Sequence, residues 1–413
     1  MNRLNPISEK ERILVIDVIR GFAIFGILLV NIPHFSYPDM YLRYLGEDNF
    51  FTQNWGVLDH LTRGFFDIFI QVKFITMFSF LFGFGMVIML ERAKEKGEKF
   101  VPIYIRRLLV LFGFGVIHAF LIWDGDILMD YAVLGLLLLL FRNFKPKTLF
   151  IWSIALFTLY AIPFSFMGAY SLTTNSGVED FYDDSYKQEM EQEAKQAIEH
   201  YQNGTIVEVF KQRIYDRLFY MELSGMWPFQ PIFYGFFMIP YFSMFLLGAA
   251  FAKWNIFRDI EKNKKLVKRI WLLGLMIGLP LNLLAYFEEA FWTVGGPFLM
   301  LFYMMSITLF MQKPKWQKRL KKFSAVGKTA FSNYILQSII CTFLFYSYGF
   351  GLYGKVYPFL GLIIAILIFA LQIYISQKWL EKFRFGPLEW IWRTLTYSHV
   401  QRFRNNKVVE TKE

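Results

Sequence analysis

Residues 13–32 read ILVIDVIRGFAIFGILLVNI, an apolar run that contains one aspartate and one arginine. A helix needs about 20 apolar residues to cross the roughly 30 Å core of a bilayer, so this run predicts a transmembrane span. No small-residue cleavage site follows the run, so we expect a retained span and not a signal peptide. Further apolar runs lie at 72–90, 104–122, 127–141, 148–170, 231–252, 270–288, 292–311, 329–347 and 356–376. The sequence therefore predicts an all-α polytopic membrane helix bundle of about ten transmembrane helices.

The composition is typical of a protein whose partner is the lipid bilayer. Apolar residues make up 55% of the chain and charged residues only 19%, whereas a soluble domain of this length would carry more charge. The net charge of +11 does not form a groove-binding patch, so we expect no nucleic-acid partner. The single cysteine, Cys341, excludes an internal disulfide and a cysteine-based zinc site.

The charges between the apolar runs predict the orientation of the chain. Lysine and arginine favour cytoplasmic loops. Basic clusters follow the even-numbered runs, at 92–107, 142–147, 253–269 and 313–322. Acidic segments follow odd-numbered runs, at 39–59, 124–126 and 171–230. This alternation predicts a multi-pass protein with both termini in the cytoplasm.

The same pattern divides the chain into four parts. They are an N-terminal membrane half (1–170, spans 1–5), an external amphipathic segment (171–230), a C-terminal membrane half (231–376, spans 6–10), and a cytoplasmic interfacial helix with a tail (377–413). The acidic external segment is interpreted as a solvated surface rather than a substrate lid. The tryptophans of the last part suit a helix at the membrane interface.

Charged and amide side chains near the predicted inner side form one group of candidate ligand-binding residues. An ionisable side chain within a span costs about 2.5–3.5 kcal/mol on insertion scales, so each needs a partner or a function. Asp17 and Arg20 lie three residues apart on one helix face, where they can form a pair that docks the span. Alternatively, Arg20 receives an anionic group such as a phosphate. The other candidates of this group are Lys328, Asn333, Gln337, Glu389 and Arg393.

Glu389 and Arg393 are spaced to pair at i,i+4, and structural docking explains them as well as ligand binding does.

A second group lies near the predicted outer side. Asn31 ends the first span, and Lys73 lies about 25 Å before the inner end of the second, at 1.5 Å per residue. His118 comes late in the third span and is followed by Asp124 and Asp126. A histidine beside carboxylates is what a general base requires, so these three are candidate catalytic residues. The alternative is a histidine that only bonds a backbone carbonyl.

Two more histidines, His34 and His60, fall in the first external segment and are further candidates for the base. A metal site is not expected. No two histidines have ligand spacing, and the Asp124/Asp126 pair alone does not specify an ion.

Five separated stretches resemble motifs of the bacterial YeiB family, which carries a domain of unknown function numbered 418. They are 12–21, 73–83, 115–128 (in the parts GVIH and WDGDIL), 326–337 and 386–393. The resemblance covers nearly the whole chain except 171–230, and it implies the bacterial inner membrane as the location.

That family is similar to membrane acyltransferases that include the lysosomal heparan-glucosaminide N-acetyltransferase. This chain resembles them chiefly in the Asp17-x-x-Arg20-Gly21 opening and in Asn31. They move an acetyl group from cytoplasmic acetyl-CoA to an amino sugar on the far side. Their catalytic histidine follows the first span, which implies His34 or His60, whereas His118 lies in a motif of the YeiB family itself. The base stays open among the three.

The leading hypothesis is a transmembrane O- or N-acyltransferase. It would move an acyl group from cytoplasmic acyl-CoA to an external or membrane-embedded hydroxyl or amine, on a glycan or lipid acceptor. The alternatives are a small-molecule transporter or export component, in which these residues bind substrate or relay protons, and a structural or sensory membrane protein. The sequence leaves a homodimer open.

Overall fold

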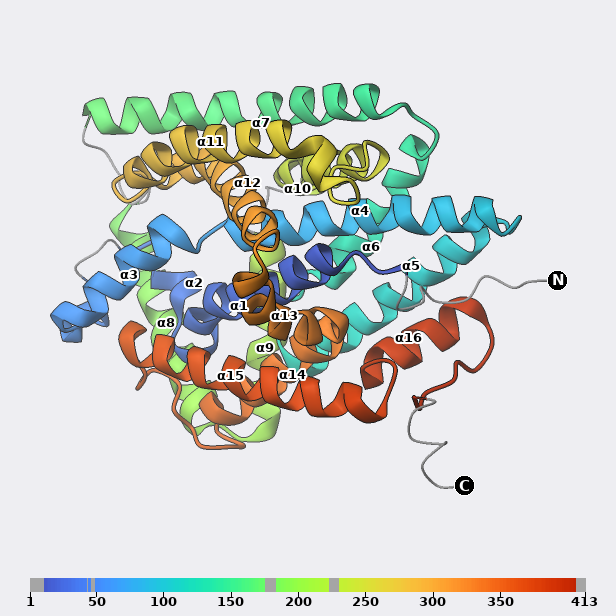
Figure 1. The fold of residues 1–413 in the computed structure, drawn as a ribbon. Helices are drawn as coiled ribbons and strands as arrows, with labels where there is room; N and C mark the ends of the chain where they lie inside the picture. The colour runs from blue at the N-terminus through green and yellow to red at the C-terminus, as the bar shows by residue number, and fades with distance from the viewer. Residues whose placement is uncertain (1–10, 43, 46–48, 175–182, 223–229, 406–413) are drawn as a thin grey trace.

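The computed structural model describes residues 11–42, 44–45, 49–174, 183–222 and 230–405. The described chain is a bundle of helices without a β-sheet, and α1 (Leu14–Ser36) runs through its middle (Figure 1). The remaining predicted spans correspond to α4 (Lys73–Glu95), α5 (Phe100–Ile117), α6 (Leu128–Leu138), α7 (Pro146–Thr174), α10 (Gln230–Lys253), α11 (Ile260–Leu284), α12 (Trp292–Phe310), α14 (Ala330–Phe345) and α15 (Pro358–Lys382).

The lengths of these helices confirm the predicted fold class. In the described part of the chain, eight helical segments are long and apolar enough to cross a membrane. Two further apolar helices, Leu128–Phe141 and Ala330–Phe345, are shorter. Large side chains such as Phe166, Met276 and Leu367 are exposed on α7, α11 and α15. Such faces are stable in the hydrocarbon of a bilayer, so this is a multi-pass membrane protein.

Helices outside the ten spans complete the bundle. They are α2 (Asp39–Leu42), α3 (Val57–Phe69), α8 (Asp184–Asn203), α9 (Ile206–Glu222), α13 (Pro314–Lys328) and α16 (Pro387–Tyr397). The amphipathic helices predicted within 171–230 are α8 and α9, and the predicted C-terminal interfacial helix is α16. Several boundaries differ from the prediction. The last span continues to Lys382 and therefore contains Trp379, and α11 begins at Ile260, ten residues before the predicted start at 270. Lys328, just before the predicted ninth span (329–347), is the last residue of α13.

Glycines allow α1 to approach α13 closely. A Cβ atom on Gly21 would lie 2.0 Å from the Phe323 carbonyl oxygen, and one on Gly327 would lie 1.8 Å from that of Asp17. Only glycine permits this backbone contact. The crossing places the end of α13, with Lys328, beside Asp17 and Arg20 of α1.

Candidate functional site

A cavity of about 500 Å³ follows α1 through the bundle. Its lining includes Asp17 and Arg20 near the start of this helix and Asn31 and His34 near its end. The 14 residues from Arg20 to His34 correspond to about 21 Å at 1.5 Å per residue. We call the part around Arg20 the arginine end and the part around His34 the histidine end. One cavity therefore joins two chemically different regions.

The arginine end is strongly cationic. Six of its lining side chains are basic, namely Arg12, Arg20, Arg92, Arg107, Lys328 and Arg393. Its two lining carboxylates are those of Asp17 and Glu389. Asp17 contacts both Arg12 (3.2 Å) and Arg20 (3.1 Å), so the pair expected from the three-residue spacing is present and gains a second arginine. The excess of guanidinium groups suits a ligand with several negative charges.

The predicted ion pair between Glu389 and Arg393 is wrong. Glu389 accepts hydrogen bonds from the backbone N–H groups of Phe331 (2.7 Å) and Ser332 (3.1 Å), and from the Ser332 hydroxyl. Its carboxylate thus caps the first turn of α14, where N–H groups have no partner within the helix. Among the described residues no ion pair joins it to Arg393, whose guanidinium lies 4.4 Å from the centre of the Phe385 ring. Burial lowers the pKa of Arg393 to about 10, so it stays cationic at neutral pH.

Apolar side chains line the middle of the cavity. They come mainly from α1 and α4 and include Ile24, Ile27, Phe78, Leu81, Met86 and Met89. Gly85 is part of the same wall, and a Cβ atom added there would meet no other atom within 4 Å. Tyr131 also lines this region, and its hydroxyl donates to the Ile75 carbonyl (3.0 Å). The middle is therefore an apolar passage between the two ends.

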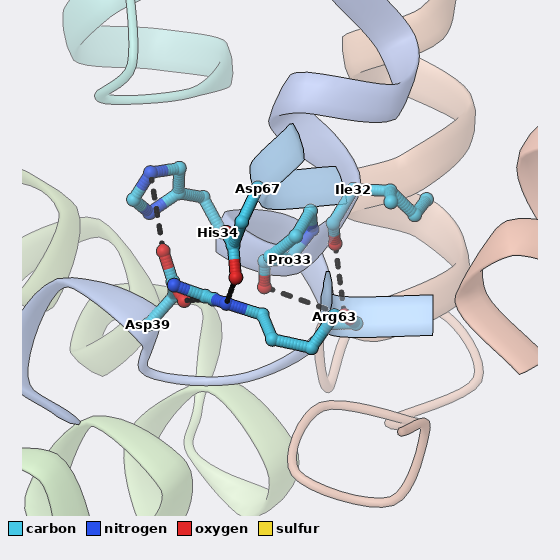
Figure 2. A network of polar contacts seen from close by, with 7 residues as sticks. Ile32, Pro33, His34, Asp39, Arg63 and Asp67 are labelled. Carbon is cyan, nitrogen blue, oxygen red and sulfur yellow. Dashed lines mark hydrogen bonds and ion pairs between the residues drawn. The ribbon is translucent and has the colours of Figure 1, made fainter. Parts of the chain in front are cut away.

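At the histidine end, His34 lies in the last turn of α1. Pro33 has no N–H group, and α1 ends at Ser36, whose hydroxyl donates to the carbonyl of Ile32 (2.8 Å). His34 Nε2 lies 3.6 Å from Asp39 Oδ2. Figure 2 shows the imidazole beside this carboxylate. The His34 side chain is 36% exposed, whereas that of Asp39 is 9% exposed. The imidazole is therefore accessible from the cavity, with a buried carboxylate behind it.

His118 has a different environment. It is fully buried on a π-helical turn (His118–Ile122), and it is not among the described residues that line the cavity. Its Nδ1 lies 2.8 Å from Asp126 Oδ1 and its Nε2 lies 2.9 Å from Ser338 Oγ. The histidine–aspartate pairing that the sequence indicated is present, but both ring nitrogens are occupied. This geometry joins the π-helical turn after α5 to α14 and leaves no nitrogen for a substrate.

The other predicted residues separate into those on the cavity and those away from it. Asp124 and Asp126 line the histidine end. His60 is exposed on α3, with its ring centre 5.5 Å from that of Trp55. Lys73 is fully buried, and its Nζ donates to the Asp67 carbonyl (2.9 Å).

Two predicted amides form a buried polar network instead of a ligand site. Asn333 Nδ2 donates to Ser376 Oγ (2.9 Å), and Gln337 Nε2 donates to Gln372 Oε1 (2.8 Å). These contacts join α14 to α15 and satisfy groups that would be costly without partners.

Sequence reasoning missed the residues that α9 contributes to the histidine end. Arg217 lines the cavity and donates to the carbonyls of Asp124 (3.0 Å) and Asp126 (3.1 Å). Asp216 accepts hydrogen bonds from the hydroxyls of Tyr41 and Tyr201, both at 2.6 Å. Burial raises the pKa of Asp124 to about 7 and that of Asp216 to about 6. The acidic composition around 171–230 gave no sign of these buried contacts.

The described residues contain no group of three or more His, Cys, Asp or Glu side chains that could hold a metal ion. What the arrangement can do chemically is bind an anionic group at one end and accept a proton at the other.

Comparisons with known proteins place the chain in a family. Residues 251–399 match the family described as "Protein of unknown function (DUF418)". The chain is 51% identical to "Uncharacterized protein YxaH" of Bacillus subtilis (strain 168) over 399 residues, which cover 96% of this chain and 97% of that protein. It is 28% identical to "Uncharacterized protein YeiB" of Escherichia coli (strain K12) over 413 residues, covering 94% and 96% of the two chains. No solved structure matches. The chain therefore belongs to the YeiB-like DUF418 family of multi-pass membrane proteins.

Proposed function

We propose that the protein is a transmembrane acyltransferase. It takes an acyl group from a CoA thioester bound at the arginine end and transfers it to a hydroxyl or amine at the histidine end. The observation that supports this most strongly is the single cavity that connects a guanidinium cluster with an accessible histidine–aspartate pair. Because lysine and arginine favour cytoplasmic loops, the arginine end faces the cytoplasm, where acyl-CoA is available.

The arginine end would bind the phosphates of the donor. Arg12 and Arg20 already share Asp17, which holds their guanidinium groups beside the cavity. A guanidinium presents a planar fork of donors that matches phosphate oxygens, and Lys328 adds an ammonium group. The donor's thioester arm would extend through the apolar middle and bring the acyl carbon to the histidine end.

His34 would act as the general base, with Asp39 behind it. The acceptor hydroxyl or amine attacks the acyl carbonyl carbon, and the imidazole takes the proton that this attack releases. The carbon–sulfur bond then breaks, and the imidazolium returns the proton to the leaving thiolate of CoA. Asn31 lies three residues before His34 on the same face of α1 and lines the same cavity, so its amide is within reach of the reacting carbonyl. The 3.6 Å separation of His34 and Asp39 would shorten when substrates bind.

The test is acyl transfer in proteoliposomes. Acetyl-CoA carrying a labelled acetyl group is placed on the side of the arginine end, and acceptors with hydroxyl or amine groups are placed on the other side. We expect transfer by the natural protein and a loss of about 10²–10⁴-fold in His34→Gln. The matched control is His60→Gln, which changes an exposed histidine outside the cavity.

Two results would contradict the proposal. One is full transfer by His34→Gln. The other is counterflow of a chemically unchanged substrate without any acyl transfer, which would identify a transporter.

A further inference from the structure

Helix α3 presents two different faces. Val57, Leu58, Leu61 and Phe65 are exposed apolar residues at helical spacing, whereas Thr62 and Phe66 are buried. Arg63 lies between these faces and points toward α2 and the end of α1 (Figure 2). An arginine on this side of α3 needs carboxylate partners, and it has two.

Arg63 bridges carboxylates from two helices. Its Nη1 donates to Asp39 Oδ1 (2.8 Å) and its Nε donates to Asp67 Oδ2 (3.2 Å). Asp67 is one turn further along α3, so it holds the guanidinium from its own helix. Asp39 therefore has one oxygen, Oδ1, 2.8 Å from Arg63 Nη1 and the other, Oδ2, 3.6 Å from His34 Nε2.

Hydrogen bonds to neighbouring segments fix both ends of α3. The Phe359 N–H donates to Asp59 Oδ1 (3.0 Å) near its start, and Lys73 Nζ donates to the Asp67 carbonyl (2.9 Å) near its end. Val72, at the joint with α4, has a φ of 68°, a left-handed conformation that is strained for a β-branched residue. Such strain persists only where surrounding contacts determine the backbone, so the joint that connects α3 to α4 has a defined conformation.

We infer that Arg63 is a positioning residue for His34, an inference that rests on the proposed function. By holding Oδ1 of Asp39, Arg63 keeps Oδ2 directed at His34 Nε2. A carboxylate in that place favours the tautomer with its proton on Nε2 and leaves Nδ1 as the atom that accepts the proton of the acceptor. A purely structural arginine would neutralise Asp39 and Asp67 without influencing the state of the imidazole.

The first measurement separates binding from chemistry. Arg63→Gln retains a polar side chain but loses the charge and the two-carboxylate bridge, and we expect kcat to fall at least tenfold with KM for acetyl-CoA unchanged. Arg63→Lys keeps the charge and should recover part of this loss. Arg258→Gln is the matched control, because Arg258 pairs with Glu91 (2.9 Å) in an exposed ion pair outside the cavity lining.

The second measurement needs no enzymatic activity. The chain has five histidines, so solid-state NMR of protein labelled with ¹⁵N-histidine can resolve His34, with His34→Gln providing the assignment. Above pH 8 we expect the His34 signals of the Nε2–H tautomer in the natural protein and in Arg258→Gln. In Arg63→Gln the two tautomers should mix.

These results distinguish the two proposals. An unchanged His34 tautomer in Arg63→Gln overturns the positioning role, whether or not the protein transfers acyl groups. A tautomer change in a protein that never transfers an acyl group supports the positioning role of Arg63 and overturns acyl transfer.

Discussion

The described part of the chain contains two histidine–aspartate pairs, and they differ in almost every physical property. His118 is fully buried and bonded through both nitrogens, at 2.8 Å to Asp126 and 2.9 Å to Ser338. His34 is partly exposed to the cavity and lies 3.6 Å from Asp39. A general base needs a nitrogen that the acceptor can reach, and burial with a hydrogen bond on each nitrogen prevents this for His118. The pair with better hydrogen-bond geometry is therefore the weaker candidate for catalysis.

The difference also predicts how much each pair contributes to the free energy of unfolding. In the His118 pair, two buried groups depend on each other, and removing one leaves the other without its partner in a medium of low dielectric constant. In the His34 pair, Asp39 keeps Arg63 as a partner, and the imidazole is partly exposed. Substitutions in each pair therefore distinguish a pair that joins helices from the pair that we propose for catalysis.

The largest expected effect on stability is that of His118→Ala. It leaves the buried Asp126 carboxylate without the imidazole, so we expect the free energy of unfolding to fall by about 3–5 kcal/mol. His34→Ala should change it by about 1 kcal/mol or less, as is usual for a partly exposed ion pair. Reversible unfolding in detergent micelles measures both. Equal losses in the two variants would remove the distinction between the pairs.

The next largest expected effect concerns the passage of the acyl donor through the cavity to His34. Gly85→Leu places a side chain in the apolar middle of the cavity, and we expect kcat/KM for acetyl-CoA to fall at least tenfold, or about 1.4 kcal/mol of transition-state stabilisation. Gly113→Leu is the matched control, because Gly113 lies on the exposed side of α5 and an added Cβ atom also meets nothing within 4 Å. Both substitutions gain similar helix propensity.

If the two leucine variants transfer equally well, the donor does not pass through the middle of the cavity. The loss of unfolding free energy caused by His118→Ala should be the same in the background of either leucine variant, because Gly85 and Gly113 are not hydrogen-bond partners of His118.

The smallest effect concerns two buried carboxylates, Asp216 of α9 and Asp124 of the loop that carries Asp126. Burial raises the pKa of Asp124 to about 7 and that of Asp216 to about 6, above the ordinary value of 3.8, so the neutral forms stabilise the packing of α9. This contribution is complete below about pH 4 and is lost as the pH rises toward about 7. The titratable groups that face this pair include Arg213, Arg217, Glu193, Tyr41, Tyr201, Tyr346 and Tyr353.

Hydrogen exchange of α8 and α9, corrected for the intrinsic rate, should therefore be slower at pH 5 than at pH 8. Asp216→Asn removes one of the two titrating groups and should reduce the difference. An exchange rate independent of pH in the natural protein would show that these carboxylates do not control the packing.

The positions of the spans could be predicted because they depend on local composition. A run such as 13–32 must form a helix in a bilayer whatever surrounds it, since its backbone groups have no other partners there. The Asp17–Arg20 pair was predictable for a similar reason, because helical spacing alone brings the two side chains together. The pairing of His118 with an aspartate eight residues away was also visible in the sequence.

The predictions that were wrong or missing concern contacts between segments that are distant in the sequence. Glu389 was expected to bond Arg393, one turn away, but the N-terminus of α14 lies beside it and offers N–H groups from 57 and 58 residues away. Arg63 and Arg217 were not considered, because their partners are brought to them by the packing of α3 and α9. Nothing in the local pattern of these residues indicates a role.

The sequence by itself determined an all-α membrane bundle, the approximate limits of its spans and the identity of the charged residues within them. Only the tertiary structure decided which charged residues share a cavity and which histidine is accessible from it. Hydrophobicity and helical spacing act over a few residues, so they can be read directly along the chain. Accessibility depends on which helices pack around a side chain, and Ser338, 220 residues after His118, decides that the second nitrogen of that histidine is already occupied.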